Sequence, residues 1–307
     1  MAIYSVAAPE EGYAGGANNT ESQGGVMKIG IVGLGLIGGS LAIDLRSQGH
    51  TILGMSRRAE TCEQAIARQI VHEASPDPKL VASADLIFLC TPLAALQDSV
   101  QQLVPHLATT AILTDVGSVK QPIVQQLAPL WPNFVGGHPM AGTAESGLDA
   151  ALSGLFVDRP YVLTPTESTP AHALATVAEV VRSLRCRLYQ CAPAEHDRAV
   201  AWISHLPVMV SASLIAACLS EPEAAVLELA QHLASSGFRD TSRVGGGNPE
   251  LGVMMARYNQ AALLNTLHAY RNQLDGLIQQ IEQANWAALD QALMRTQAER
   301  PKFVEPQ

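Results

Sequence analysis

The chain has 307 residues, 48% of them hydrophobic and 15% charged, which is enough for two domains with large buried cores. Its formal net charge of −9 argues against nucleic acid or an anionic membrane as a partner, and we expect no apolar run to span a bilayer. The five cysteines are odd in number and lack metal-ligand spacing, so we expect reduced thiols in a cytoplasmic protein without a metal site.

Residues 1–26 differ in composition from the rest of the chain. They are rich in Gly, Ala, Asn and Glu and contain no Lys or Arg. A secretory signal needs a basic start before an apolar centre, and a transit peptide needs arginines. We therefore predict a disordered extension over residues 1–26, with the functional protein beginning at Met27.

The next segment combines an apolar run of strand type with a glycine-rich turn. Lys28–Val32 leads into Gly33, Gly35 and Gly38 at G-x-G-x-x-G spacing, and a helix-period segment follows. Such a turn lets the backbone approach a pyrophosphate, which the free N–H groups and the dipole of the helix N-terminus attract. Glycine spacing alone is weak, but the strand before it and the helix after it favour a dinucleotide-binding site over a plain turn.

The residues after the second predicted strand indicate which dinucleotide binds. Thr51–Met55 is followed by Ser56, Arg57 and Arg58, whereas an NAD-binding site usually has an acidic residue about 20 residues after the glycines. A hydroxyl and two guanidinium groups suit the 2′-phosphate of NADP, which a carboxylate would repel. The sequence therefore favours NADP as the cofactor, although two solvated loop arginines would give the same pattern.

Strand-type and helix-type runs alternate from residue 27 to residue 191. This alternation predicts a Rossmann-type domain, an α/β fold with a doubly wound, mostly parallel sheet and helices on both faces. Ligands on such sheets bind at the carboxyl ends of the strands. The seven predicted strands are Lys28–Val32, Thr51–Met55, Leu86–Cys90, Ala111–Thr114, Phe134–Gly136, Tyr161–Thr164 and Arg187–Cys191.

The remaining residues, 192–307, have helical patterns almost throughout and predict an all-α C-terminal domain. One long helix is expected over Leu251–Glu282, with leucine and isoleucine side chains at three- and four-residue steps. A small domain rarely buries such a stripe fully, so we expect a homodimer formed through this half. The alternative is that the stripe packs only against neighbouring helices.

Three segments at predicted strand ends carry polar residues that suit a cofactor or a reaction. Thr91 and Pro92 follow one strand and form either a loop over the cofactor or a simple turn. Ser118 follows the next strand and could orient a neighbouring imidazole or the nicotinamide. His138 comes after two glycines and before a proline, and we expect it on a rigid loop as an acid–base group, although a loop histidine is often an ordinary surface residue.

The helical half contributes two further candidates. His205 lies in the segment Ser204–Pro207, which is predicted to break one helix and start the next, so this histidine either faces a cleft or caps a helix end. Arg243 lies in the segment Ser235–Pro249, which is predicted to be a helix end followed by a glycine-rich loop that carries two arginines and an aspartate. A guanidinium can hold a carboxylate through two parallel hydrogen bonds. A surface set of ion pairs among Arg239, Asp240 and Arg243 is the alternative.

These segments, in this order, resemble the prephenate/arogenate dehydrogenases of tyrosine biosynthesis, and in particular the cyanobacterial arogenate dehydrogenases. The resemblance covers nearly all of the chain from residue 27, and the strings DVGSVK and GHPMAG carry it most specifically. The resembling segments are Lys28–Ser40, Thr114–Lys120, Gly137–Gly147, Ser204–Pro207 and Gly237–Arg243.

The resemblance implies roles for the matching residues. His138 would accept the proton of the ring hydroxyl of the substrate, Ser118 would position His138, and Arg243 would bind the ring carboxylate. Together with the motifs above, it gives as cofactor-binding residues Gly33, Gly35, Leu36, Ile37, Gly38, Ser56, Arg57, Arg58, Thr91, Pro92 and Ser118. The corresponding substrate-binding residues are Arg243, His205, His138, Thr143 and Asp240.

Two positions depart from the pattern of this family. Many prephenate-type members carry a second histidine directly after the SHLP proline, where this chain has Val208, and some carry an aromatic residue where it has Gly252. Both departures bear on how the substrate side chain is recognised. Together with Ser56, Arg57 and Arg58, they favour oxidative decarboxylation of arogenate to tyrosine with NADP.

Three other functions remain open. The chain could act on prephenate and yield 4-hydroxyphenylpyruvate. It could be another two-domain dehydrogenase of the β-hydroxyacid type, but those enzymes use a catalytic lysine in the helical half, and the only lysine after Lys120 is Lys302. It could also be an NADPH-binding sensor without turnover, against which His138 and Ser118 argue.

Overall fold

The computed structural model divides into two compact units. The described residues are 4–5, 25–143 and 145–304. The first unit comprises Met1–Val200 with Gly246–Tyr258, and the second comprises Ala201–Gly245 with Asn259–Gln307. The first unit thus includes two stretches of the predicted helical half. The predicted disordered extension, residues 1–26, lies mostly outside the described residues and to that extent stays a prediction, but its residues Tyr4–Ser5 form a short strand that pairs with Arg187–Gln190.

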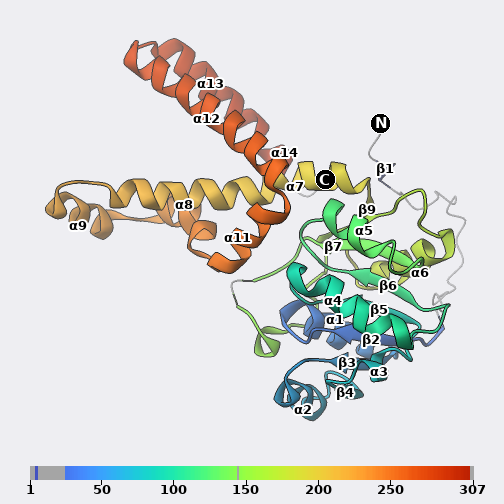
Figure 1. The fold of residues 1–307 in the computed structure, drawn as a ribbon. Helices are drawn as coiled ribbons and strands as arrows, with labels where there is room; N and C mark the ends of the chain where they lie inside the picture. Colours follow the sequence, from blue (N-terminus) through green and yellow to red (C-terminus); the bar gives the residue numbers. More distant parts are fainter. Residues whose placement is uncertain (1–3, 6–24, 144, 305–307) are drawn as a thin grey trace, which may run out of the picture. The chain divides into compact units, whose positions relative to one another are not determined.

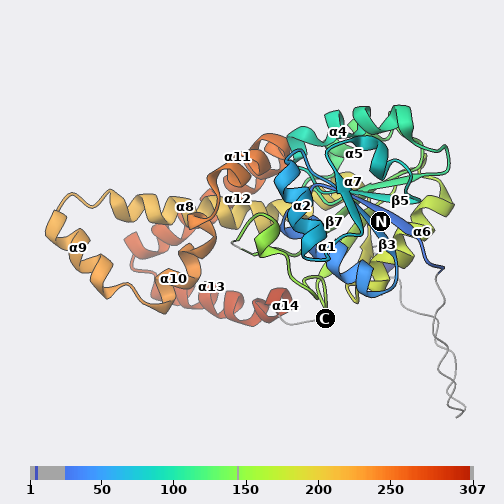
Figure 2. The ribbon, with the colours of Figure 1, turned by 90° about the horizontal axis from the view of Figure 1, so that it is seen from below.

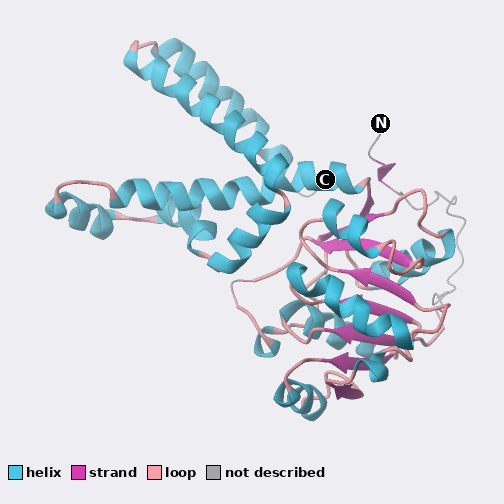
Figure 3. Ribbon diagram, in the orientation of Figure 1, coloured by secondary structure: helices cyan, strands magenta, loops and turns pink. Residues whose placement is uncertain are grey.

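A nine-stranded sheet forms the centre of the first unit, in the order β1-β9-β8-β7-β6-β5-β2-β3-β4 (Figures 1 and 3). The strands from β2 to β7 run parallel, whereas β8 is antiparallel to β7 and β1 is antiparallel to β9. The strands are β1 Tyr4–Ser5, β2 Lys28–Val32, β3 Thr51–Met55, β4 Glu73–Ser75, β5 Leu86–Leu89, β6 Ile112–Asp115, β7 Phe134–Pro139, β8 Pro160–Thr164 and β9 Arg187–Gln190. The predicted α/β class with a doubly wound sheet is confirmed.

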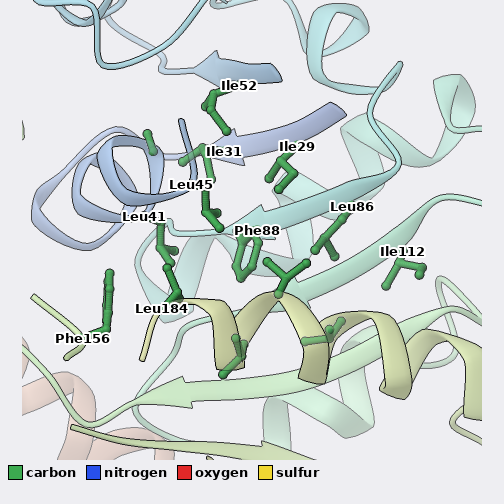
Figure 4. Packing of buried hydrophobic residues seen from close by; sticks show 14 of the residues in the cluster. Ile29, Ile31, Leu41, Leu45, Ile52, Leu86, Phe88, Ile112, Phe156 and Leu184 are labelled. Carbon is green, nitrogen blue, oxygen red and sulfur yellow. The ribbon is translucent and has the colours of Figure 1, made fainter. Parts of the chain in front are cut away.

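Helices cover both faces of this sheet, which explains why the parallel strands are apolar on both sides. Alternate residues of one strand enter different cores: Phe88 packs with α1 and α6, and Leu89 packs with α4 and α5. Figure 2 shows α4 and α5 on one side of the sheet and α1 and α6 on the other. Figure 4 shows Leu41 and Leu45 of α1 against the first of these cores.

The helices of the first unit mostly connect successive strands. They are α1 Leu36–Ser47, α2 Ala59–Ala67, α3 Pro78–Val81, α4 Leu96–Leu103, α5 Gln121–Leu127, α6 Ala171–Ser183, α7 Pro193–Val200 and α11 Pro249–Tyr258, with 3₁₀ turns η1 Leu93–Ala95, η2 Val104–His106 and η3 Leu148–Ala150. Helix α11 belongs here because Met254 and Tyr258 pack against the core formed by α4 and α5.

The described part of the second unit is entirely helical. Its elements are the π turn η4 Ala201–His205, α8 Leu206–Leu219, α9 Ala224–Leu233, α10 Ser236–Ser242, the 3₁₀ turn η5 Arg243–Gly246, α12 Gln260–Glu282, α13 Trp286–Glu299 and α14 Pro301–Val304. Helices α12 and α13 form a hairpin that meets α8 near η4 and diverges from it beyond that point (Figure 1).

The chain stays helical through Pro207, so the predicted break at Ser204–Pro207 is wrong. The π turn η4 continues the helix, and Pro207 falls in the first turn of α8, where a missing N–H is tolerated. The resulting run, Pro193–Leu219, is long and apolar enough to cross a membrane by length and composition alone. This corrects the expectation that no apolar run in the chain is long enough to span a bilayer.

The predicted long helix Leu251–Glu282 is in fact two helices, separated at Asn259. This residue has non-helical backbone angles, with φ −117° and ψ 35°, and its side chain is buried. An asparagine side chain competes for backbone hydrogen bonds and therefore favours helix ends over helix interiors. The apolar period continues across Asn259, which is why the sequence pattern did not reveal the boundary.

Candidate functional site

The glycine-rich turn joins β2 to α1 at the centre of the sheet. β2 pairs with β3 on one side and with β5 on the other, so the strand order reverses here, and ligands of such sheets bind at this point. Gly33 has φ +102°, and its N–H donates to the carbonyl oxygen of Met55 at 2.8 Å. A Cβ at Gly38 would collide with the carbonyl oxygen of Gly33, so this turn requires glycine at both positions.

The N-terminus of α1 fits a phosphate group. Gly35 is its N-cap and has no side-chain cap hydrogen bond, and the first turn contains no acidic residue. The N–H groups of Leu36, Ile37 and Gly38 therefore have no acceptor within the helix, and a Cβ at Gly35 would meet open space. This combination of donors, dipole and free approach suits the pyrophosphate of a dinucleotide.

The tip of β3 presents the three residues that the sequence singles out for a 2′-phosphate. Arg57 and Arg58 are exposed, and the N–H of Arg58 donates to Oγ of Ser56 at 3.3 Å. Among the described residues, no ion pair involves either arginine. Both guanidinium groups are thus available to a ligand, and no acidic residue follows β3 before Glu60.

Three further predicted residues follow the carboxyl ends of β5 and β6. Thr91 is half-buried, with its Oγ1 3.4 Å from Oγ of Ser99, and Pro92 is the N-cap of η1. Ser118 is half-buried on the loop between β6 and α5. These positions share one edge of the parallel sheet with the glycine-rich turn.

His138 lies on a strand, not on the expected loop. β7 extends to Pro139 because it pairs antiparallel with β8, and His138 is opposite Val162 in that pairing. Its side chain is 8% exposed. A proline as the last strand residue is compatible with the ladder, so the flanking glycines and proline did not end the strand as predicted.

The side chain of His138 contacts a second histidine, on α7. Nδ1 of His138 is 2.8 Å from Nε2 of His196, and the two rings meet edge to face. Nδ1 of His196 is in turn 2.8 Å from Oδ1 of Asp197. Asp197 accepts from the backbone N–H groups of Lys120 at 2.7 Å and of Gln121 at 2.8 Å. Burial lowers the pKa of His196 below its usual range, against the opposing effect of Asp197.

A buried ion pair supports the backbone beside His138. Nζ of Lys120 contacts Oδ2 of Asp115, and both side chains are fully buried. Nζ of Lys120 also donates to the carbonyl oxygen of Gly137 at 2.7 Å, and Asp115 accepts from the N–H of Gly117 at 2.8 Å. Burial lowers the pKa of Lys120, while the attraction of Asp115 raises it. The pair therefore ties the end of β6 to β7 immediately before His138.

Sequence reasoning missed His196, Asp197, Asp115 and Lys120. His196 and Asp197 are one polar pair on a helix, 58 residues from His138 in the chain, and no spacing rule connects them. A signal did exist for Asp115 and Lys120, because an acidic and a basic residue bracket the short segment that follows the strand residues Ala111–Thr114. Such a pair at a buried strand end indicates mutual neutralisation.

The remaining predicted residues are distributed over both units. In the first unit, Thr143 is exposed, and its Oγ1 accepts from the N–H of Glu145. In the second unit, His205 is fully buried and its Nδ1 accepts from Nδ2 of Asn259 at 3.1 Å, so it does not cap a helix end. Asp240 pairs with Arg239 at 3.4 Å on the surface. No described ion pair involves Arg243, which is exposed at the start of η5.

Comparison with known proteins matches both halves of the chain to one family. The model of the prephenate dehydrogenase nucleotide-binding domain matches residues 41–190, and that of the prephenate dehydrogenase dimerization domain matches residues 192–295. The prephenate dehydrogenase of Bacillus subtilis is 30% identical over 82% of this chain and 70% of its own length.

Two solved structures extend this likeness to the fold. Synechocystis arogenate dehydrogenase is 56% identical, with a TM-score of 0.83 over 91% of this chain and all of its own. The prephenate dehydrogenase of Aquifex aeolicus, in complex with hydroxyphenyl propionate and NAD⁺, is 27% identical, with a TM-score of 0.86 over 91% of this chain and 99% of its own. The chain is therefore an oxidoreductase that belongs to the prephenate/arogenate dehydrogenase family.

Proposed function

We propose that this chain catalyses the NADP-dependent oxidative decarboxylation of arogenate to tyrosine. The observation that carries the cofactor choice is the tip of β3, where Ser56, Arg57 and Arg58 stand without an acidic residue. The substrate choice is supported by the 56% identity to Synechocystis arogenate dehydrogenase and by Val208, where many prephenate-type members have a histidine.

In this proposal the first unit holds the dinucleotide at the carboxyl edge of its sheet. The backbone of Gly33, Gly35, Leu36, Ile37 and Gly38 binds the pyrophosphate. The guanidinium groups of Arg57 and Arg58 and the hydroxyl of Ser56 bind the 2′-phosphate through charge-assisted hydrogen bonds. Thr91, Pro92 and Ser118 border the nicotinamide. When bound, the oxidised nicotinamide accepts a hydride from the substrate.

His138 is the proposed general base. It takes the proton of the ring hydroxyl as the hydride leaves the carbon that bears this hydroxyl. The bond from the ring to its carboxylate then breaks, carbon dioxide departs, and the electron pair of that bond makes the ring aromatic. The product oxygen recovers the proton from His138, so the base returns to its starting state. Ser118 positions His138 in this scheme.

We propose Arg243 as the group that binds the ring carboxylate, with His205, Thr143 and Asp240 as further substrate-binding residues. Arg243 suits this role because it is exposed and no described ion pair occupies it. A guanidinium binds a carboxylate through two parallel hydrogen bonds and so fixes its orientation. His205 is held in one orientation by its hydrogen bond to Asn259.

The proposal is tested by following the absorbance of reduced nicotinamide with each cofactor and each substrate. We expect the highest kcat/KM with arogenate and NADP. A better rate with prephenate would keep the family and overturn the substrate assignment. Absence of turnover with all four combinations would overturn the proposed activity as a whole.

A paired variant tests the cofactor assignment separately. Replacing Arg57 and Arg58 together by Ala should raise the Kd for NADP at least tenfold and leave the Kd for NAD unchanged, because NAD lacks the 2′-phosphate. The control is Arg295→Ala, which removes an exposed arginine of α13 in the second unit. Equal losses for NADP and NAD in the double variant would contradict the assignment.

A further inference from the structure

His138 is the first member of a hydrogen-bonded chain of three side chains. From Nδ1 of His138 the chain passes to Nε2 of His196 at 2.8 Å, and from Nδ1 of His196 to Oδ1 of Asp197 at 2.8 Å. His196 and Asp197 are both buried, which restricts their side chains to the orientation observed. The three residues come from β7 and α7.

The direction of each hydrogen bond in this chain follows from Asp197. Both of its oxygens accept backbone N–H groups, as an ionised carboxylate does, so Nδ1 of His196 must be the donor to Oδ1. A neutral His196 then carries a lone pair on Nε2, and this nitrogen can only accept. Nδ1 of His138 is therefore protonated and donates to His196.

The opposite arrangement is unfavourable on physical grounds. If His138 accepted at Nδ1, His196 would either turn a lone pair toward the carboxylate or carry a proton on both nitrogens. The first option places two electron-rich atoms, Nδ1 of His196 and Oδ1 of Asp197, 2.8 Å apart. The second option gives a positive charge to the imidazole of His196, although burial already lowers the pKa of this group.

We propose that His196 and Asp197 are positioning residues that hold His138 in the tautomer with a lone pair on Nε2. This inference rests on the proposed role of His138 as the base. With Nδ1 protonated, Nε2 is the atom that takes the hydroxyl proton. The imidazolium that then forms on His138 is stabilised through His196 by the negative charge of Asp197, which itself stays ionised.

The charged groups around His196 are consistent with this role. Asp197 is on the same helix as His196. Asp115 at the end of β6 and Lys120 at the start of α5 are the charged groups on the neighbouring elements, and His138 faces His196 from β7. Lys120 is neutralised by Asp115, and Asp197 is the carboxylate in direct contact with His196. His138 is therefore connected to the negative charge of Asp197 through the imidazole of His196.

The first test reads the tautomer without any turnover. In protein with ¹⁵N-labelled histidine, the ring nitrogens of His138, assigned by their loss in His138→Asn, should show a protonated Nδ1 and an unprotonated Nε2 at neutral pH. Asp197→Asn should move the titration of His138 to lower pH, because the stabilising charge is gone. A wild-type His138 with a protonated Nε2, or an unchanged titration in Asp197→Asn, would overturn the proposal.

The second test uses turnover with whichever substrate and cofactor pair the wild type prefers. Asp197→Asn should lower kcat roughly 100-fold or more and move the acid limb of the kcat profile to lower pH, while KM and the Kd for the cofactor change little. His196→Gln keeps an acceptor for Nδ1 of His138 and should retain more activity than His196→Leu. Equal loss in these two variants, with an unmoved acid limb, would indicate a purely structural role.

The two tests distinguish failure of this inference from failure of the proposed function. If the wild type turns over no pair of substrate and cofactor, the proposed function fails, and the nuclear magnetic resonance experiment still decides the tautomer. If the wild type is active and the tautomer is the opposite one, the proposed function stands and the role of His196 and Asp197 is rejected.

Discussion

At the scale of single residues, the site depends on buried polar groups that satisfy one another. Lys120 and Asp115 are both fully buried, and neither charge would be tolerated at that depth without the other. The same lysine donates to the carbonyl oxygen of Gly137, one residue before His138. The ion pair thus links the stability of the sheet to the placement of the proposed base.

Removing the lysine amino group should expose this dependence. We expect Lys120→Met to lower the free energy of unfolding by roughly 3–5 kcal/mol, because it leaves the carboxylate of Asp115 buried without its cation. Urea denaturation of the variant and the wild type measures this difference. Lys79→Met, at an exposed position on α3, is the matched control and should change stability by less than about 0.5 kcal/mol. A variant as stable as the control would show that the pair contributes no net stability.

At the scale of elements, the sequence predicted the strands well where apolar runs end at Gly, Pro or a polar residue. The first two predicted strands, Lys28–Val32 and Thr51–Met55, agree with β2 and β3 at both ends. The strand β4, Glu73–Ser75, was missed because three residues at a sheet edge carry no apolar pattern. The helix α10 was taken as part of a loop because Ser and Gly dominate its start.

The candidate site was predictable in its local motifs and not in its long-range pairs. The glycine-rich turn is recognisable because one short segment contains the strand, the turn and the helix start. His138 was found from its motif, but its place on β7 depends on pairing with β8, which local signals do not encode. The contact between His138 and His196 depends on the packing of α7, so no sequence pattern of this single chain contained it.

The boundary between α11 and α12 gives a prediction at the same scale. Asn259 is buried and donates to Nδ1 of His205, so Asn259→Ala removes a donor from a buried imidazole. We expect a loss of about 1–3 kcal/mol in unfolding free energy, measured by urea denaturation. Gln260→Ala, at the exposed neighbouring position, is the control and should be close to wild type. A loss no larger than that of the control would mean that the hydrogen bond between Asn259 and His205 does not stabilise the boundary between α11 and α12.

At the scale of the whole molecule, the second unit leaves large apolar side chains exposed. Leu274, Ile278 and Ile281 of α12 are 44%, 45% and 53% exposed, and Leu293 and Met294 of α13 are exposed as well. Of the apolar stretch in the run Pro193–Leu219, only 17% is buried. Contiguous apolar surface of this kind marks an interaction site. Because residues 192–295 match a dimerization domain, we propose a second copy of this chain as the partner.

This proposal predicts that charge on the α12 stripe dissociates the dimer. Leu274→Glu combined with Ile278→Glu should convert a wild-type dimer into a monomer in sedimentation equilibrium, because each substitution replaces about 1.5–3 kcal/mol of apolar burial with a carboxylate that resists desolvation. Gln273→Glu combined with Gln279→Glu adds the same charge to polar, exposed positions of α12 and should leave the dimer intact. A wild type that stays monomeric at every concentration would reject the proposed dimer. A double variant that remains dimeric would place the interface elsewhere on the second unit, away from Leu274 and Ile278.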